Sequence, residues 1–153
     1  MLQLYSKGCE YVIRCLSEMS ESDCKNGFLI ETICKRAKTP EWFSRKIFQT
    51  LVKKKILVTK RGPGGGYRFR TAPSKISLLT VIQAIDGKKA FSKCIMRNSA
   101  CRDTSYCVLH PIWNELKDVL IGQLSSNTVD QIMKKNNFKA CLSAGGKDHN
   151  GNG

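Results

Sequence analysis

Apolar residues return at helical spacing in two segments near the start of the chain. Residues 6–19 and 30–37 place them every three or four positions, which predicts two amphipathic helices. Ser6 fits the N-cap of the first helix, and the stretch from Asp23 to Gly27 has the composition of a turn. The apolar positions are Val12, Cys15, Leu16 and Met19 in the first helix and Ile30, Ile33, Cys34 and Ala37 in the second.

The next segment predicts a third helix, with Thr39 as its N-cap and Pro40 at its first position. Two short helices joined by a tight turn, the second amphipathic and basic, are typical of a helix-turn-helix. The apolar face of the third helix comprises Phe43, Ile47, Phe48, Leu51 and Val52, and its polar face comprises Arg45, Lys46, Gln49, Lys53 and Lys54.

Two β-strands are expected after this helix, from Ile56 to Arg61 and from Tyr67 to Arg70. The glycine-rich stretch from Gly62 to Gly66 permits a tight hairpin between them. A phosphate-binding loop would instead end in Gly-Lys-Ser/Thr before a helix, and here a strand follows. A basic hairpin directly after a helix-turn-helix is a wing.

The second half of the chain contains one short helix and one long helix. Residues 77–86 predict a helix that ends at Gly87, whereas residues 88–110 show no period. From Pro111 onward an apolar stripe continues past Gly122, and Thr128 fits the cap of a short piece, 129–135. A long helix with an apolar face outside a small domain needs a partner, and a second copy of the chain is the simplest one.

We therefore expect a mostly α-helical fold with a small β-hairpin wing (α+β), namely a winged helix-turn-helix with a long C-terminal dimerisation helix. The expected units are a DNA-binding domain at 1–86, a cysteine-containing loop at 87–110, a dimerisation region at 111–136 and a disordered tail at 137–153.

Positive charge is concentrated in one part of the chain. The formal net charge is +14, and residues 35–70 carry twelve basic side chains against one acidic side chain, which is +11. Residues 1–34 sum to −2 and residues 71–153 to +5. Basicity this concentrated on foldable sequence favours nucleic acid as the partner. A solvated basic face and a patch for acidic lipid are the alternatives.

The composition argues against a membrane protein and a secreted disulfide scaffold. Apolar runs are only a few residues long, and the N-terminus has no basic region before an apolar block, so neither a membrane span nor an export signal is expected. A chain of 153 residues with eight cysteines can fold without disulfides. We expect a thiol-rich cytoplasmic protein, with Cys15 and Cys34 as small core residues and no assigned role for Cys24 and Cys141.

The aperiodic loop carries a set of soft metal ligands. Cys94, Cys101, Cys107 and His110 are separated by six, five and two residues. Structural zinc sites favour closer pairs, whereas a two-iron cluster needs a wider cage and can accept histidine as a ligand. The spacing thus places iron–sulfur only modestly ahead of zinc. Coincidental cysteines, with one pair oxidised, are the remaining interpretation.

The chain resembles the Rrf-type winged-helix regulators, the bacterial family that contains IscR, NsrR and RirA. The resemblance covers roughly residues 1–136 and rests on the order of its segments. Most specific is the wing string RGPGGGY (61–67) in combination with the three-cysteine loop. The other matching segments are SKG (6–8), the helix-turn-helix and VIQAIDG (81–87).

The resemblance implies a homodimeric transcription regulator that binds double-stranded DNA at a two-fold symmetric operator and carries an iron–sulfur cluster as its sensor. The loop is most similar to that of IscR, where three cysteines and a histidine hold a 2Fe–2S cluster, so we expect Cys94, Cys101, Cys107 and His110 to hold one here. The first gap is one residue longer than in IscR. NsrR-like members take their fourth ligand from an acidic residue at the position of Cys9, which makes Cys9 the second candidate.

Two alternatives keep the DNA-binding half. One is a 4Fe–4S sensor of nitric oxide, like NsrR, or of iron, like RirA. The other is a zinc-stabilised regulator that does not respond to iron or oxidant.

Two other classes of protein fit the sequence less well. An electron-transfer protein would have no need for the +11 window. The only histidines, His110 and His149, form no apparent catalytic arrangement, so we expect no enzyme.

DNA contacts are expected from the third helix and the wing. Arg45 and Lys46 lie near the start of the helix, where they can pair with guanine acceptors. The resemblance aligns them with glutamate and glutamine of IscR, so a different operator is expected. Arg61 is a minor-groove candidate. Phosphate contacts fall to Lys53, Lys54, Lys60 and Arg68, and Gln49, Gly64 and Tyr67 complete the expected DNA-binding set.

Overall fold

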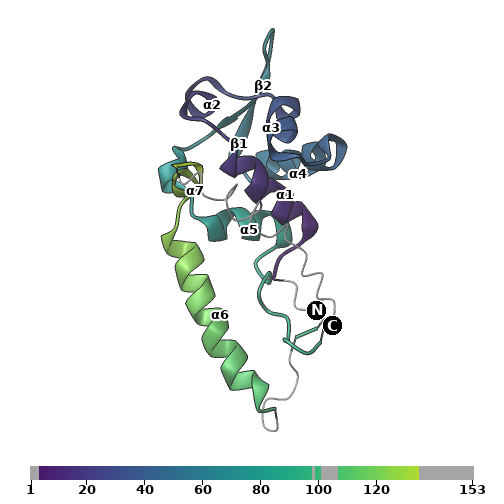
Figure 1. Ribbon diagram of the computed structural model, residues 1–153, viewed down its shortest axis with the longest axis vertical. Coiled ribbons are helices and arrows are strands. Elements are labelled where there is room, and N and C mark those ends of the chain that lie inside the picture. Colours follow the sequence, from purple (N-terminus) through teal and green to yellow (C-terminus); the bar gives the residue numbers. More distant parts are fainter. Residues whose placement is uncertain (1–3, 98, 101–106, 135–153) are drawn as a thin grey trace, which may run out of the picture.

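The computed structural model describes residues 4–97, 99–100 and 107–134. The described part of the chain is mostly helical with one antiparallel hairpin, which confirms the expected fold class (Figure 1). The elements are α1 (Lys7–Ser17), α2 (Glu21–Asn26), α3 (Ile30–Ala37), α4 (Glu41–Lys53), β1 (Leu57–Lys60), β2 (Gly66–Phe69), the short 3-10 helix η1 (Pro73–Lys75), α5 (Leu78–Asp86), α6 (Leu109–Ser126) and α7 (Val129–Lys134).

The predicted helix starts are largely confirmed. Ser6 caps α1 by accepting a hydrogen bond from the backbone N–H of Cys9 at 3.2 Å, and Ser77 caps α5 in the same way through Thr80 at 3.1 Å. The helix-turn-helix is formed by α3 and α4, and Gly87 ends α5 with a φ of +86°.

The turn predicted from Asp23 to Gly27 is wrong, because most of it belongs to α2. Ser20 and Asp23 form a reciprocal capping box: the Ser20 hydroxyl accepts from the Asp23 N–H at 3.2 Å, and the Asp23 carboxylate accepts from the Ser20 N–H at 2.7 Å. These bonds satisfy free backbone donors and stabilise a helix of only six residues.

The prediction that Thr39 caps α4 is also wrong. Pro40 occupies the N-cap position and no side chain caps the helix. Thr39 is instead buried, and its hydroxyl lies 3.3 Å from the Cys15 sulfur. Of the five predicted apolar positions of α4, Phe48 and Leu51 are buried and the other three are half-buried.

The main core lies between α1, α3 and α4 and is closed by the hairpin, α5 and α7. Val12, Ile33, Phe48 and Leu51 are almost completely buried there, as are the thiols of Cys15 and Cys34, as predicted. Val129 of α7 belongs to the same core, so the end of the described chain returns to the winged-helix unit.

The hairpin pairs Leu57 with Phe69 and Lys60 with Gly66. A further bridge joins it to the segment before α3: the N–H and C=O groups of Phe28 and Tyr67 exchange two hydrogen bonds of 2.8 Å. The base of the wing is thereby fixed to the helix-turn-helix.

A second, smaller apolar cluster joins three parts of the fold. Cys9 of α1, Ile82 of α5 and Phe91 of the following segment are buried together, and Leu120 and Leu124 of α6 pack against them. From this cluster α6 extends away from the winged-helix unit (Figure 1). Along its first half, apolar side chains face solvent in this chain, namely Leu109, Ile112, Leu116 and Val119.

Candidate nucleic-acid interface and sensor loop

The exposed face of α4 presents the side chains predicted to read bases. Arg45, Lys46, Gln49 and Lys53 are all exposed, while the opposite face of the helix packs into the main core. Arg45 forms an ion pair with Glu41 one turn earlier. The hydrogen bond from Arg45 to Glu41 raises the already high pKa of the guanidinium, so Arg45 stays charged and is held against the helix start until another acceptor replaces the carboxylate.

The wing presents a second exposed basic surface beside α4. Arg61 and Arg68 are exposed, and the ammonium group of Lys60 donates to the carbonyl of Asn26 at 3.1 Å. Gly64 lies at the tip with a φ of +70°, and a Cβ added there would meet no atom within 4 Å. Its backbone is therefore free to approach a ligand closely.

Tyr67 differs from the other expected contact residues because its side chain is buried, with 5% exposure. Its ring packs against those of Phe28 and Phe48, and its hydroxyl accepts a 2.8 Å hydrogen bond from the Gln49 amide. Tyr67 thus ties the wing to the exposed face of α4, which fixes the spacing between the two basic surfaces.

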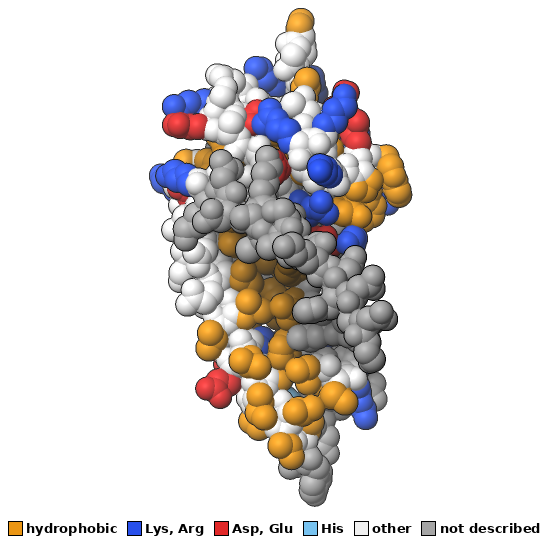
Figure 2. All heavy atoms as spheres, in the orientation of Figure 1, with side chains coloured by type: hydrophobic (Ala, Val, Ile, Leu, Met, Phe, Trp, Pro, Cys, Tyr) orange, Lys and Arg blue, Asp and Glu red, His pale blue; other side chains and the backbone are white. Residues whose placement is uncertain are grey.

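Most of the basic window is not neutralised within the protein. The structure describes all of residues 35–70, and three of the twelve basic side chains there form ion pairs: Lys35 with Glu31, Arg36 with Asp23 and Arg45 with Glu41. The nine others form none with the described residues, and Lys53 and Lys54 are exposed at the end of α4. Basic side chains are prominent over the winged-helix end of the molecule in Figure 2. A surface of this kind attracts polyanions.

The sensor loop, that is the cysteine-containing loop at 87–110 in which the sequence predicts the sensor, is described at its two ends. Cys94, Cys107 and His110 are half-buried, whereas Cys101 lies outside the described residues. The Cys94 sulfur accepts a hydrogen bond from the Met96 N–H at 3.4 Å, and the Cys107 carbonyl accepts from the His110 N–H at 3.1 Å. Cys107 and His110 are therefore three residues apart on one helical turn.

The two ends are joined by a hydrogen bond that sequence analysis did not anticipate. The Trp113 indole N–H donates to the Lys93 carbonyl at 2.9 Å, and Trp113 is buried. This bond fixes the residue before Cys94 to the turn that follows His110. Among the described residues no three metal-binding side chains meet, but the donor set of thiols and an imidazole is that of a soft metal centre.

His110 and Cys9, the two candidates for the fourth ligand, lie in different surroundings. The Nε2 atom of His110 is 2.8 Å from the Asn114 amide, a partner that can orient the ring. Cys9 has no exposed surface, and burial, followed by the nearby carboxylate of Asp86, raises the pKa of its thiol to about 12. As a ligand, Cys9 would need both an opening of the smaller cluster and loss of its proton.

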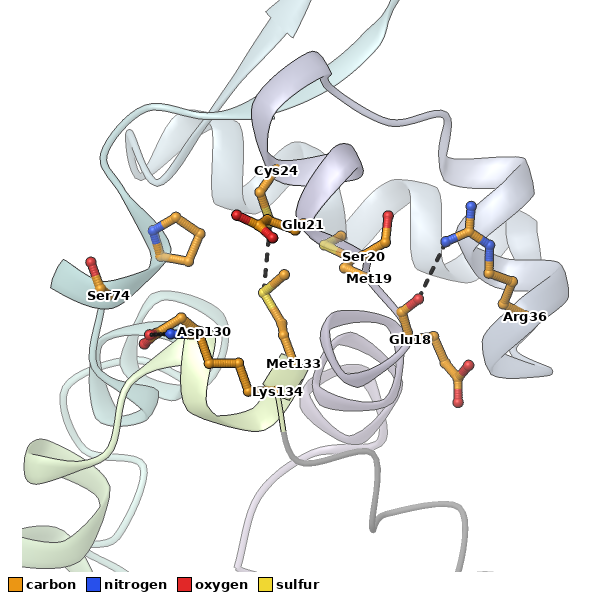
Figure 3. A pocket seen from close by; sticks show the side chains of 11 residues that line it. Glu18, Met19, Ser20, Glu21, Cys24, Arg36, Ser74, Asp130, Met133 and Lys134 are labelled. Atoms are coloured by element: carbon orange, nitrogen blue, oxygen red, sulfur yellow. Dashed lines mark hydrogen bonds and ion pairs between the residues drawn. The ribbon is translucent and has the colours of Figure 1, made fainter.

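Cys24 lies away from both surfaces, at a cavity of about 680 Å³ between α2 and α7 (Figure 3). Its sulfur is 3.7 Å from that of Met133, and burial, more than the nearby Asp23 and Glu21, raises the pKa of the thiol to about 11. The contact between Cys24 and Met133 helps to hold α7 against the winged-helix unit. Neither residue belongs to the sensor loop.

Trp42 is the one exposed residue of the α4 face that sequence analysis overlooked. Trp42 is the second residue of α4, and its large apolar side chain is 76% exposed. The available signal was its spacing, because Trp42 precedes Arg45 by three residues and Lys46 by four.

No helix within the described ranges is both long and apolar enough to cross a bilayer.

Comparisons with known proteins agree on one family and one fold. The family model Rrf2, described as an iron-dependent transcriptional regulator, matches residues 5–135. The transcriptional regulator IscR of Vibrio atlanticus is 29% identical over 135 residues, which cover 88% of this chain and 77% of the relative. IscR of Aliivibrio salmonicida is 26% identical over 153 residues, covering 94% and 90%.

Two solved structures show the same fold. The cysteine regulator CymR of B. subtilis superposes with a TM-score of 0.71 at 18% identity, covering 88% of this chain and 98% of that chain. IscR of T. potens superposes with a TM-score of 0.65 at 18% identity, covering 96% and 93%.

Proposed function

The chain belongs to the Rrf2 family, and from this membership we propose that it is a homodimer whose operator binding is controlled by an iron–sulfur cluster. Its relatives show that it is a DNA-binding transcriptional regulator and not an enzyme. A protein that acts on chromosomal DNA works in the cytoplasm, where we place it. The observation that carries the proposal is the joining of the soft-ligand loop to α6 and, through the smaller apolar cluster, to the DNA-binding unit.

On DNA, α4 lies in the major groove, and Arg45 and Lys46 read base edges. The exposed ammonium groups of Lys53 and Lys54, together with the wing residues Lys60 and Arg68, contact phosphates and set the affinity and its salt dependence. Arg61 reaches the minor groove beside the backbone of Gly64. Gln49 and Tyr67 position the wing against α4 through their hydrogen bond.

Dimerisation uses the solvent-facing apolar side chains of α6. Figure 2 shows apolar side chains gathered over the lower half of the molecule, away from the basic end. A contiguous apolar surface of this kind is rare on a monomer and is typical of an interface. Two copies related by a two-fold axis present two α4 helices to a two-fold symmetric operator.

Cys94, Cys101, Cys107 and His110 are the residues that hold the cluster. A 2Fe–2S cluster with one histidine ligand would supply an oxidisable and protonation-sensitive centre at the start of α6. Asn114 orients the His110 ring, and Trp113 keeps the first and last ligands at one end of the helix. His110 is favoured over Cys9 because it is only half-buried, whereas the Cys9 thiol is enclosed and its raised pKa resists deprotonation.

Control of DNA binding follows from the position of the smaller cluster. Phe91, which precedes the cysteines in the chain, belongs to this cluster, and Leu120, which follows them on α6, packs against it. Cys9 of the same cluster lies on α1, and α1 packs against α4. A change at the loop that shifts α6 therefore reaches α4 through two packed helices. Such a change alters DNA affinity only if the two arrangements bind the operator differently.

The first test is iron, zinc and acid-labile sulfide per chain in protein purified without oxygen. About two irons and two sulfides per chain, with little zinc, support a 2Fe–2S cluster. About four of each favour the 4Fe–4S alternative, and zinc without sulfide favours the zinc-stabilised regulator. If the protein contains neither metal nor sulfide, only the DNA-binding part of the proposal remains.

The second test compares operator binding by the wild type and by Cys101→Ala, with Cys24→Ala as the thiol control. We expect Cys101→Ala to lose the metal and to change operator affinity or site preference, while Cys24→Ala keeps both. Equal affinity and preference of the wild type and Cys101→Ala would overturn control by the cluster. Metal loss in His110→Ala but not in Cys9→Ala assigns the fourth ligand to His110.

A further inference from the structure

We propose that Trp42 is a specificity-determining residue of the DNA-binding face and that it recognises the C5-methyl group of a thymine in the major groove of each half-site. The proposal rests on the DNA-binding function and adds a base-reading residue to it.

Trp42 lies on the same helical face as the basic side chains of α4. Positions 45, 46, 49 and 53 follow Trp42 by three, four, seven and eleven residues, which places all five on one side of a helix. All five side chains are exposed, whereas Ser44, Phe48 and Leu51 on the opposite side are buried. Trp42 is thus directed where Arg45 and Lys46 are directed.

The ring is held in place from the protein side. Trp42 meets Phe43 edge-to-face at a centroid distance of 5.6 Å, and Phe43 meets Tyr11 of α1 in the same way at 5.7 Å. Edge-to-face pairs of this kind favour defined ring orientations. The Phe43 ring therefore supports the indole on one side, while about three-quarters of the Trp42 surface stays open for contact with a ligand.

The chemistry of the indole selects an apolar group on the base edge. It offers one N–H donor and no acceptor or charge, so it cannot neutralise a phosphate. In the major groove the thymine methyl is the apolar feature of a base pair, and it is recognised by apolar contact.

The neighbouring residues define where this thymine lies. Lys46 is one helical turn, about 6 Å, from Trp42 along the helix axis. That distance corresponds to about two base pairs at a rise of 3.4 Å. The half-site is therefore expected to contain a thymine within about two base pairs of the guanine contacted by Arg45 or Lys46.

A protein partner is the other occupant that an exposed tryptophan could serve. The surroundings favour DNA, because the other exposed positions on α4 are the polar residues Arg45, Lys46, Gln49 and Lys53, whereas the apolar ring that Trp42 contacts, Phe43, is half-buried. Interface cores are depleted in charged residues, so a protein-docking site would have an apolar surround.

The experiment selects binding sites from a random duplex pool with the full-length wild type, Trp42→Phe and Trp42→Ser. We expect one thymine position per half-site in the wild type and in Trp42→Phe, and no preference there in Trp42→Ser. Replacing this thymine by deoxyuridine, which removes only the methyl group, should weaken wild-type binding about 3- to 10-fold. The same replacement should leave the affinity of Trp42→Ser unchanged.

The proposal is overturned if Trp42→Ser selects the same sequences with the same deoxyuridine penalty, or if its binding is weakened equally at all sequences. Failure of the wild type itself to select any sequence contradicts the DNA-binding function instead, and the proposal falls with it. Circular dichroism and the melting temperature of Trp42→Ser should match those of the wild type, since the side chain is exposed.

Discussion

Asp23 holds together the entry to the helix-turn-helix. Its carboxylate accepts hydrogen bonds from the Ser20 backbone and hydroxyl and from the Arg36 guanidinium, all at 2.7–2.8 Å. Partial burial opposes ionisation, but the hydrogen bonds from Arg36 and Ser20 outweigh it and hold the pKa of Asp23 below its ordinary value. A carboxylate with a lowered pKa stabilises the fold above its unfolded pKa, and this contribution is lost as the pH falls through the folded value.

We predict that Asp23→Asn lowers the free energy of unfolding by about 1 kcal/mol at pH 7. The difference from the wild type should persist above the ordinary aspartate pKa of about 4 and shrink as the pH falls through the lowered pKa of folded Asp23, where the wild-type carboxyl is protonated as well. Urea unfolding at a series of pH values measures it. Glu21→Gln, two residues earlier in the same helix, removes only a surface ion pair with Lys25; it is the control and should change stability little. A difference that is independent of pH would contradict the prediction.

Gly66 is required where the wing crosses the segment before α3. A Cβ on Gly66 would lie 2.2 Å from the carbonyl oxygen of Phe28, so the bridge between Phe28 and Tyr67 would have to open. We predict that Gly66→Ala lowers the free energy of unfolding by about 2–4 kcal/mol. Gly64→Ala is the matched control: it meets no atom within 4 Å and should cost only about 1–2 kcal/mol for its positive φ. Equal losses in the two variants, measured by urea unfolding, would show that the close approach does not matter.

At the scale of elements, the parts of the fold that depend on local pattern were predictable. The stripes of α1, α3 and α4, the cap at Ser77 and the glycine-rich hairpin each depend on residues a few positions apart. The pattern S-x-x-D at Ser20 was a local signal too, and its capping box was overlooked because the segment is short and polar. Residues 88–110 have no period, so the hydrogen bond from Trp113 to Lys93 could not be inferred from them.

The return of α7 to the main core is the element that local pattern could not place. Residues around Thr128 and Ile76 are far apart in sequence, yet the Val129 N–H donates to the Ile76 carbonyl at 2.9 Å and the Leu78 N–H donates to the Asn127 carbonyl at 2.9 Å. Because α7 follows α6 directly, this docking connects the expected dimerisation helix to the DNA-binding unit at a second place.

We predict that Val129→Ala lowers the free energy of unfolding by about 1–3 kcal/mol, because Val129 is completely buried in the main core. Lys134→Ala, at an exposed position of the same short helix, removes only a surface ion pair with Asp130 and should be close to neutral. Chemical denaturation of both variants measures the difference. If the two variants are equally stable, α7 does not contribute to the core of the protein in solution.

At the scale of the whole molecule, the DNA-binding end and the expected dimer helix are separate (Figure 1), and the proposed dimer would set the distance between two α4 helices. On α6, Leu109, Ile112, Leu116 and Val119 follow the alternating three- and four-residue spacing of a coiled-coil seam. Leu116 and Val119 are 56% and 60% exposed in the single chain. Leaving this seam in water would be unfavourable, and a second α6 can cover it.

We predict that Leu116→Glu converts the dimer into a monomer at micromolar concentration, because a carboxylate placed opposite its own copy is both desolvated and repelled. The winged-helix unit should remain folded, since Leu116 lies outside both apolar clusters. Sedimentation velocity measures the oligomeric state. Gln123→Glu adds the same charge at an exposed site on the same helix and should remain dimeric.

The same variant separates dimerisation from DNA contact. As the proposed dimer, the wild type should bind a two-fold operator as one unit, so we expect its affinity for the full operator to exceed that for a half-site by a large factor. Leu116→Glu should bind the full operator only about as tightly as the half-site, while its half-site affinity and salt dependence stay those of the wild type, because α4 and the wing are unchanged. If Leu116→Glu remained a dimer, the two copies would meet through another surface, and the symmetric placement of the two α4 helices by α6 would be wrong.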